Sequence, residues 1–420
     1  MSGKELGTGA PTGERLKSLD IIRGFALLGL PFMNIISFAM PMSAYLNPMS
    51  WDTDNPLNYP FFAVSYLFFD QRFMGLFALL YGAGAALLCD KLRTEQGSAG
   101  GIFIRRQLWL LVIGISHAWF LWNGDILTLY AMLGFMLFPL LNLRAVNLMI
   151  IAGLCLAGAA FLGTMDGVSH EALGDAAWRD LGAFFAPDAE QLIAMKAFYQ
   201  GDYQQLMHFL RGANWDGGEM ATGADFVLLN WFFSVALKAF AMMCIGVALL
   251  RMGWLSGSAP VRLYQRLAFA GVGGGFALSL FGLWWNHDMG WSMSAWFSFG
   301  LVPNILASTL MSLGYLGLLC LWIGRGDGGK TLQKALANVG RMALTNYLGQ
   351  SLIMALIFFG YGLGWYAQLG REALFLVAVC IGLMQIVVSG LWLAVFRQGP
   401  MEWLWRALTW WTLPPLLKRN

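Results

Sequence analysis

The sequence predicts an all-α protein, a polytopic bundle of transmembrane helices, and three observations support this fold class. Hydrophobic residues make up 58% of the chain, and the mean hydropathy is +0.61. Charged residues make up only 12%, whereas soluble chains carry about 25%. The apolar residues also fall in repeated runs of about 20, the length of a membrane-spanning helix, and do not alternate as they would in a β-barrel. The expected partner is therefore the lipid bilayer, and nothing in the net charge of +3 indicates nucleic acid.

The N-terminal half is expected to hold five spans. Residues 1–18 are polar and glycine-rich, so we expect a cytoplasmic segment there and no cleaved signal peptide. The transmembrane half, residues 19–163, has apolar runs at 19–40, 59–88, 107–121, 126–141 and from Arg144 to about 163. The run 59–88 is about ten residues longer than one span requires, and Asp70-Gln71-Arg72 interrupts it. We expect a short membrane-dipping helix before the interruption and a full span after it.

The second half of the chain begins with a polar region, residues 164–225. It carries ten carboxylates against three basic residues, and Asp188 and Asp202 suit helix N-caps, with Gly212 as a stop. We expect two short amphipathic helices that form an acidic cap outside the membrane. The C-terminal transmembrane half, residues 226–400, follows with spans at 226–250, 263–285, 296–323, 342–361 and 373–396, and residues 401–420 form an interfacial, tryptophan-rich tail.

The distribution of basic residues predicts the orientation. Lysine and arginine concentrate at both termini, at Arg144 and in the loops 91–106, 251–266 and 325–341. The intervening loops are poor in both. The positive-inside rule is satisfied at every turn by about ten spans with the N and C termini in the cytoplasm, and a dipping helix would make eleven.

His117 is the strongest candidate functional residue. It lies about 16 Å along a helix from Arg106, near the middle of a bilayer core that is about 30 Å thick. An ionisable side chain at that depth marks a functional site by default. Asp125 follows across the turn Trp122-Asn123-Gly124, and a carboxylate that holds one imidazole nitrogen makes the histidine competent as a general base. The alternative is a structural histidine bonded to a carbonyl of a neighbouring helix.

Two charged pairs are further candidates for substrate binding. Asp20 and Arg23 are i,i+3 neighbours near the cytoplasmic boundary, and they are either a snorkelling pair or substrate contacts. Asp70 and Arg72 stand two positions apart at the interruption of the second run, so each needs its own partner unless the helix bends.

The remaining substrate-binding candidates are uncharged. Trp122, Asn123 and Tyr130 lie near His117 in sequence, and Asn346 lies inside a later apolar run, where hydrogen bonding between helices is the alternative. No metal site is expected, because no second histidine or cysteine stands three or four positions after His117 and the five cysteines lack ligand spacing.

Five motifs occur in order along the chain: RLKSLDIIRGFALLGLPFMNI, FFDQRFMGLFALLYGAG, RRQLWLLVIGISHAWFLWNGDILTLYAMLG, GRMALTNYLGQSLI and GPMEWLWRALTW. Together they resemble the bacterial YeiB family, whose C-terminal half is the DUF418 domain of unknown function. The resemblance covers most of the chain outside residues 164–225.

The resemblance implies an activity, because the family is placed in a transmembrane acyltransferase superfamily with heparan-α-glucosaminide N-acetyltransferase. An acyl group would pass from a carrier such as acyl-CoA to a hydroxyl or amine of a glycan, lipid or small acceptor, in the bacterial cytoplasmic (inner) membrane. Asn34 falls on the catalytic asparagine of the eukaryotic relatives, and Asp70 on an aspartate of their second span. Their catalytic histidine lies in the loop after the first span. Here residues 41–58 contain no histidine, and Tyr45 stands at about that spacing.

Three function classes therefore stay open. In the first, a membrane acyltransferase, His117 is the general base and Asp125 orients it, Asn34 is an oxyanion or acceptor donor, and Arg23 and Arg72 contact an anionic donor. If His117 does not supply the base, the chemistry has been lost or changed. The second class is a transporter or lipid-handling carrier with a buried polar pathway. The third is a non-catalytic scaffold or sensor. The acyl donor, the acceptor and any homo-oligomeric assembly are not specified by the sequence.

The predicted orientation can be tested by chemical labelling of intact cells. A cysteine introduced near Gly217 should react with a membrane-impermeant thiol reagent, because residues 164–225 are expected outside. Labelling that requires permeabilised cells would reverse the orientation.

Overall fold

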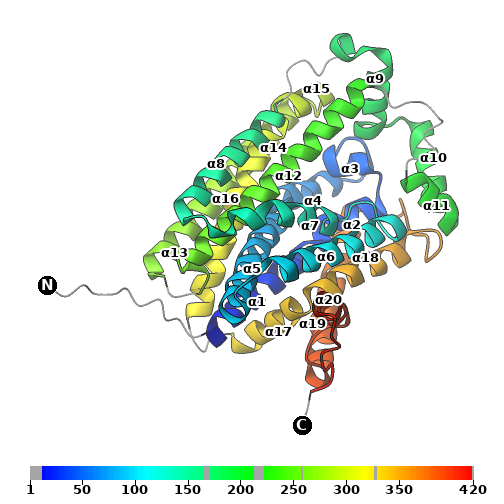
Figure 1. Cartoon of the computed structure of the whole chain (residues 1–420). Coiled ribbons are helices and arrows are strands. Elements are labelled where there is room, and N and C mark those ends of the chain that lie inside the picture. The colour runs from blue at the N-terminus through cyan, green and yellow to red at the C-terminus, as the bar shows by residue number, and fades with distance from the viewer. Residues whose placement is uncertain (1–11, 165–169, 212–221, 257–258, 326–328, 419–420) are drawn as a thin grey trace.

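The computed structural model describes residues 12–164, 170–211, 222–256, 259–325 and 329–418. These residues form helices joined by short turns, as Figure 1 shows, and contain no β-strand beyond one isolated bridge between Phe396 and Leu417. The predicted all-α class is confirmed.

The helices of the first half are α1 (Thr12–Gly29), α2 (Pro31–Ala39), α3 (Met42–Leu46), α4 (Asn58–Phe68), α5 (Arg72–Gln96), α6 (Gly100–Phe120), α7 (Leu127–Leu137), η1 (Phe138–Asn142) and α8 (Ala145–Leu162). The cap region holds α9 (His170–Phe185), α10 (Ala189–Tyr199) and α11 (Tyr203–Leu210). The remaining helices are α12 (Thr222–Arg251), η2 (Trp254–Ser256), α13 (Val261–Ala268), η3 (Phe269–Gly273), α14 (Gly274–Asp288), α15 (Met293–Ala295), η4 (Trp296–Gly300), α16 (Val302–Gly324), α17 (Lys330–Arg341), α18 (Ala343–Phe358), α19 (Arg371–Val395) and α20 (Pro400–Trp410).

Within the described ranges, seven helical segments are long and apolar enough to cross a membrane. The other three expected spans correspond to α6, to α7 with η1, and to α18. The last two are apolar but shorter, since they run over Leu127–Asn142 and Ala343–Phe358. A helical membrane protein is thus established, while the count of ten spans stays a prediction.

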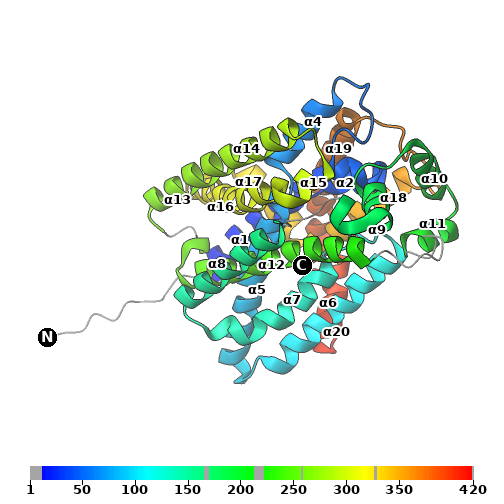
Figure 2. The same ribbon diagram turned by 90° about the horizontal axis from the view of Figure 1, so that it is seen from above.

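Helix α12 lies at the centre of the bundle and packs against α5 and α8. Its second half is buried almost without interruption, from Ala239 to Leu250. A helix that is apolar on all sides is typical of such a central position. Figure 2 shows α12 surrounded by α8, α5 and α16.

Two of the helical runs are broken. Leu30 and Pro31 separate α1 from α2, because proline has no N–H to continue the ladder and its ring clashes with the preceding turn. The second break is the expected one at Asp70-Gln71-Arg72. Gln71 takes a left-handed conformation (φ 58°) between α4 and α5, and a non-glycine residue there needs compensating contacts.

Two segments expected as basic loops are largely helical. Residues 91–106 were predicted to form a loop, but α5 continues to Gln96 and α6 begins at Gly100. Lysine and arginine favour helices and can extend their charges to water from the membrane boundary. Residues 325–341 were also predicted as a loop. Their second part forms the amphipathic α17, which packs on α1 so closely that a Cβ at Gly24 would lie 1.9 Å from the carbonyl oxygen of Leu336.

The cap region contains three described helices where two were predicted. Asp188 and Asp202 are N-caps as expected, since each carboxylate accepts a hydrogen bond from the backbone N–H three residues later. The unexpected helix is α9, which buries Leu181 and Phe185. Gly212, the predicted stop, lies outside the described residues. Figure 1 shows α9, α10 and α11 at the opposite end of the bundle from α13, α17 and the C terminus.

Helix α11 is bound to the end of α6 by residues at both of its ends. The Tyr203 hydroxyl donates to the carbonyl of Phe120 over 2.8 Å. The Arg211 guanidinium donates to the carbonyl of Trp119 over 2.9 Å and lies over the Trp119 ring. These carbonyls end a helix and have no partner within it, so the cap completes the C terminus of α6.

Amide hydrogen exchange tests whether the cap is folded in solution. Residues 202–211 should exchange far more slowly than an unstructured peptide, because Leu206 and Met207 are buried at 0% and 2% exposure. Arg211→Gln should raise the exchange rate of α11 by removing its bond to Trp119. Exchange of the parent protein at the unstructured rate would mean that no lid exists.

Candidate functional site

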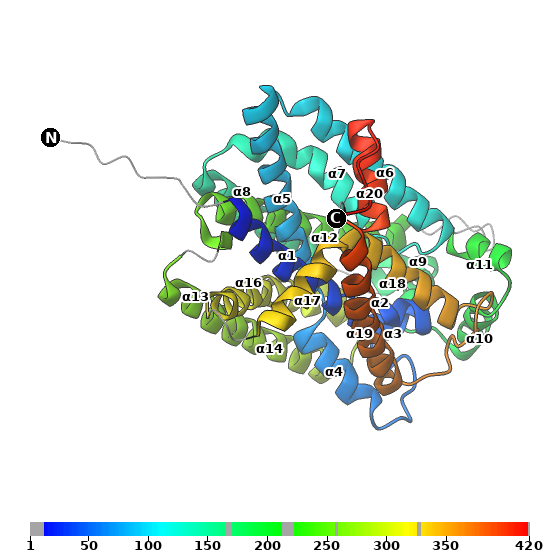
Figure 3. The ribbon, with the colours of Figure 1, turned by 90° about the horizontal axis from the view of Figure 1, so that it is seen from below.

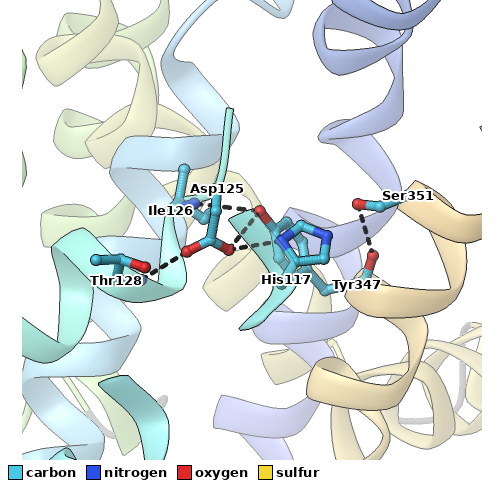
Figure 4. A network of polar contacts seen from close by, with 6 residues as sticks. All are labelled: His117, Asp125, Ile126, Thr128, Tyr347 and Ser351. Carbon is cyan, nitrogen blue, oxygen red and sulfur yellow. Dashed lines mark hydrogen bonds and ion pairs between the residues drawn. The ribbon is translucent and has the colours of Figure 1, made fainter. Parts of the chain in front are cut away.

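His117 and Asp125 form a buried pair at the end of α6. The Nδ1 atom of His117 lies 2.8 Å from Oδ1 of Asp125. The two side chains are only 2% and 1% exposed. Figure 4 shows the imidazole facing the carboxylate, with Tyr347 beside both. The structure therefore brings together the two residues that the sequence analysis paired.

The Asp125 carboxylate is held by two further groups. The backbone N–H of Thr128 donates to Oδ2 over 2.7 Å, so the carboxylate also caps the first turn of α7. The Tyr347 hydroxyl donates to Oδ1 over 3.5 Å and accepts from the N–H of Ile126 over 3.2 Å. Gly114 makes room for this arrangement, because a Cβ there would lie 2.5 Å from the Thr128 nitrogen.

Nε2, the second imidazole nitrogen of His117, makes no hydrogen bond to any described residue. A carboxylate can only accept, so Nδ1 carries a hydrogen, and in the neutral form of the ring Nε2 presents its lone pair. Within the described part of the chain, Nε2 is buried and has no hydrogen-bond partner. The Tyr347 ring lies 5.4 Å and the Trp122 ring 6.3 Å from the imidazole, centroid to centroid. In this arrangement, Asp125 holds Nδ1 and the Nε2 lone pair is free to act as a base.

The helix that carries His117 begins earlier than predicted, and its depth in the bilayer stays a prediction. The prediction measured depth from Arg106 as the start of the span, but α6 begins at Gly100 and ends at Phe120. His117 therefore lies in the last turn of the helix. Its burial comes from α7, α18 and the turn at Trp122, so protein contacts exclude water here.

A cavity of about 880 Å³ lies beside this pair. We call it the basic cavity, since five basic and three acidic side chains line it, namely Arg23, Lys91, Arg106, Arg341 and Arg406 with Asp20, Glu95 and Glu402. Tyr347 and Leu127 line it too, whereas His117 and Asp125 do not. The Tyr347 side chain thus stands between the basic cavity and the histidine–aspartate pair.

Three predicted substrate-binding residues line the basic cavity. Asp20 and Arg23 form an ion pair of 2.9 Å on its wall, with about a quarter of each side chain exposed. Tyr130 is buried and donates to the carbonyl of Met74 over 2.8 Å. Other walls come from α5 and α6, and the sequence could not suggest that α17, α18 and α20 close the cavity.

The remaining predicted residues divide by position. Trp122 is buried and stacks on Phe38 with ring centroids 4.6 Å apart, while Asn123 is exposed. Asn34 is half-buried, and among the described residues its side chain has no hydrogen bond to either member of the histidine–aspartate pair. Asn346 donates to Val339 and to Ser389, which matches the alternative of hydrogen bonding between helices.

Asp70 and Arg72 belong to a separate buried network at the break between α4 and α5. Asn304 of α16 joins them, because its amide donates to the Asp70 carboxylate and its oxygen accepts from Arg72 over 2.6 Å. Arg72 is fully buried and also donates to Ser279 and to the carbonyl of Asp70. Tyr45 donates to the other Asp70 oxygen over 2.5 Å. The helix bends, and neither residue faces the basic cavity.

Lys238 of α12 is the member of this network that sequence reasoning missed. Its ammonium group is fully buried and donates to Gln71 and Ser308, each over 2.6 Å. The contact with Gln71 holds the left-handed residue in place. The sequence carried a signal, since Lys238 is the one charged residue in the apolar run 226–250, and charges inside spans are rare and functional or structural.

Comparisons with known proteins give one family match and several full-length relatives. The profile of the family described as "Protein of unknown function (DUF418)" matches residues 249–412. The chain is 33% identical over 402 residues to the uncharacterized protein YeiB of Escherichia coli, across 94% of this chain and 96% of that protein. It is 28% identical over 417 residues to the uncharacterized protein YxaH of Bacillus subtilis, across 97% and 98%. These names assign no activity.

The Asp70 network predicts a large loss of stability on mutation. Asp70→Ala removes the one carboxylate from a described network that contains Arg72 and Lys238, so the buried Arg72 guanidinium loses its counter-charge. We expect the free energy of unfolding in detergent micelles to fall by roughly 3–5 kcal/mol. Asp90→Ala on the exposed face of α5 is the matched control and should change it by less than about 0.5 kcal/mol. Equal effects would mean that the network is not a stabilising element.

Proposed function

The chain belongs to the YeiB family, with a DUF418 region in its C-terminal half, and for this member we propose acyl transfer within the membrane. An acyl group passes from an activated carrier to a hydroxyl or amine of an acceptor. We place the protein in the cytoplasmic (inner) membrane of a bacterium, with the bilayer as its permanent partner.

The observation that carries this proposal is the state of His117. Asp125 holds Nδ1 at 2.8 Å, and Nε2 is buried without a partner in the described part of the chain. This is the arrangement of a general base whose tautomer and orientation are fixed by a carboxylate. Exclusion of water strengthens the interaction between the carboxylate and the imidazolium that forms.

The chemical step uses this base twice. The acceptor O–H or N–H gives its proton to Nε2 of His117 while the acceptor atom attacks the acyl carbonyl of the donor. The bond between the acyl carbon and the carrier then breaks, and the leaving group takes the proton back from His117. Asp125 stabilises the charged imidazolium between the two events. No redox partner or metal is required.

The position of the pair suggests how the two substrates approach it. The basic cavity lies on the side of Tyr347 and is where we place the donor. The cap lies at the other side, since Tyr203 and Arg211 bind the last carbonyls of α6, one turn beyond His117. An acceptor would therefore enter beneath α11. Asn34 has no contact with the pair, so the proposal rests on His117 and Asp125 and not on Asn34.

A carrier is the second candidate, and the broken span favours it. Discontinuous helices with charged residues at the break line the transport sites of many membrane carriers. Here α4 and α5 separate at Asp70-Gln71-Arg72, and Lys238 stands opposite. Uptake of a candidate substrate into proteoliposomes that is lost in Asp70→Asn but retained in His117→Gln would favour this function.

His117→Gln tests the acyltransferase proposal. Glutamine keeps the size and hydrogen bonding of the side chain but cannot accept the proton, so turnover should fall by about 10²–10⁴-fold. Release of free carrier from a panel of acyl thioesters, with and without candidate acceptors, measures this for purified protein in detergent.

His287→Gln is the matched control, because His287 is exposed at the end of α14, outside the basic cavity and the histidine–aspartate pair. It should turn over like the parent, and both variants should melt like the parent. Full turnover by a correctly folded His117→Gln protein would remove His117 from catalysis.

A further inference from the structure

We propose that the basic cavity binds an amphiphile whose phosphate-bearing headgroup has a net negative charge, with the headgroup against the arginines and the acyl chain directed toward Tyr347. The inference rests on the proposed function, because it names the class of donor that would bring an acyl group to His117. It concerns binding, however, and can be measured without turnover.

The acidic residues of the basic cavity are already satisfied. Asp20 pairs with Arg23 at 2.9 Å, and Glu95 lies 3.7 Å from Lys91. Glu402 accepts from the backbone N–H groups of Leu344 and Thr345 over 2.6 and 3.1 Å. It therefore occupies the N terminus of α18, where burial raises its pKa and these hydrogen bonds oppose the rise. No acid is left to neutralise further cations.

Three arginines of the same cavity form no direct ion pair with a carboxylate among the described residues, although Arg341 is close enough to Asp20 to attract it. Arg106 lies over the Trp405 ring at 3.5 Å, and Arg341 donates to the carbonyl of Arg397. Arg406 is exposed at the mouth. Unpaired guanidinium groups that share one concave site suit phosphate oxygens, which they bind with paired, charge-assisted hydrogen bonds. A lone carboxylate, as in a free fatty acid, would leave most of this charge unmatched.

The other end of the basic cavity is neutral and largely apolar. Phe77, Leu80, Leu110 and Leu127 line it, and Tyr347 closes it. Phe77 and Lys91 lie on α5 fourteen positions apart, which corresponds to about 21 Å along the helix. A small anion such as inorganic phosphate would leave this end filled with water. A ligand with an anionic head and a long apolar chain matches both ends.

The apolar end of the basic cavity is also the end that lies nearest the histidine–aspartate pair. Tyr347 is the residue common to the basic cavity and the Asp125 contacts, with its hydroxyl 3.5 Å from Oδ1. Two sources carry the required chemistry: a soluble acyl thioester of a nucleotide carrier, and an anionic phospholipid of the bilayer. Both present phosphate oxygens at one end and an acyl group at the other.

The experiment measures equilibrium binding of the full-length protein in a neutral surfactant or in nanodiscs. The probes are palmitoyl-coenzyme A for the soluble source and phosphatidylglycerol for the lipid source, with phosphatidylcholine as the neutral lipid. The double variant Arg341→Gln/Arg406→Gln should weaken binding of the preferred probe by about 10- to 100-fold. The control Arg262→Gln/Arg266→Gln removes two exposed arginines of α13 outside the cavity and should leave the affinity unchanged.

A second variant fills the interior of the basic cavity. A Cβ at Gly84 would have the Arg23 guanidinium as its nearest neighbour, at 4.0 Å. Gly84→Phe should therefore fill the basic cavity without displacing the surrounding helices and abolish binding of the palmitoyl probe. Gly390→Phe, where a Cβ meets nothing within 4 Å, is the matched control.

The binding measurements distinguish the soluble donor from the lipid. Loss of affinity for palmitoyl-coenzyme A in both cavity variants supports the soluble donor, and the same pattern for phosphatidylglycerol supports the lipid. If the cavity variants bind every probe as the parent does, or if phosphatidylcholine binds as well as phosphatidylglycerol, the inference fails. His117→Gln should bind the probe normally in every case. The turnover of that variant therefore tests the proposed function alone, and its binding of the probe tests the cavity.

Discussion

The cost of holding polar and charged side chains away from water governs the arrangement of this bundle. An ion inside a protein requires a counter-charge and hydrogen bonds for its remaining donors and acceptors. The two buried clusters meet this requirement with residues from different helices. Asn304 joins Asp70 to Arg72, and Asp125 is shared by His117, Thr128 and Tyr347. Each cluster thereby fixes the relative positions of the helices that supply it.

Each of the two clusters leaves a buried nitrogen without a partner among the described residues, Nε of Arg72 at the helix break and Nε2 of His117 at the end of α6, but the two atoms differ in chemistry. At the helix break, Asp70 and Lys238 each have two partners on other elements. At the end of α6, Nε2 of His117 has none among the described residues. The Nε–H group of Arg72 can only donate, whereas Nε2 of His117 can accept a proton. A buried polar atom without a partner costs stability, and such a cost is tolerated where the atom takes part in chemistry.

Local sequence was sufficient for features that depend on neighbours along the chain. The break at Asp70-Gln71-Arg72, the N-caps Asp188 and Asp202, and the pairing of His117 with Asp125 all span eight residues or fewer. The basic cavity could not be predicted in this way. Tyr347 meets Ile126 across 221 positions, and Trp405 meets Arg106 across 299. Such contacts follow from which helix faces another, as Figure 3 shows for α20 beside α6, and periodicity alone carries no information about that choice.

The hydrogen bonds of Tyr203 and Arg211 to the end of α6 have a consequence for the biogenesis of the protein. The hairpin of α6 and α7 leaves the ribosome well before α11 and α18, which supply Arg211, Tyr203 and Tyr347. Until they arrive, the carbonyls of Trp119 and Phe120 lack the partners seen in the finished fold, and Asp125 has His117 and Thr128 but lacks Tyr347. Exposed polar groups of this kind do not enter hydrocarbon. The tip of the hairpin must therefore stay hydrated at the membrane surface during synthesis. The histidine–aspartate site gains all its contacts only when the last third of the chain has been inserted.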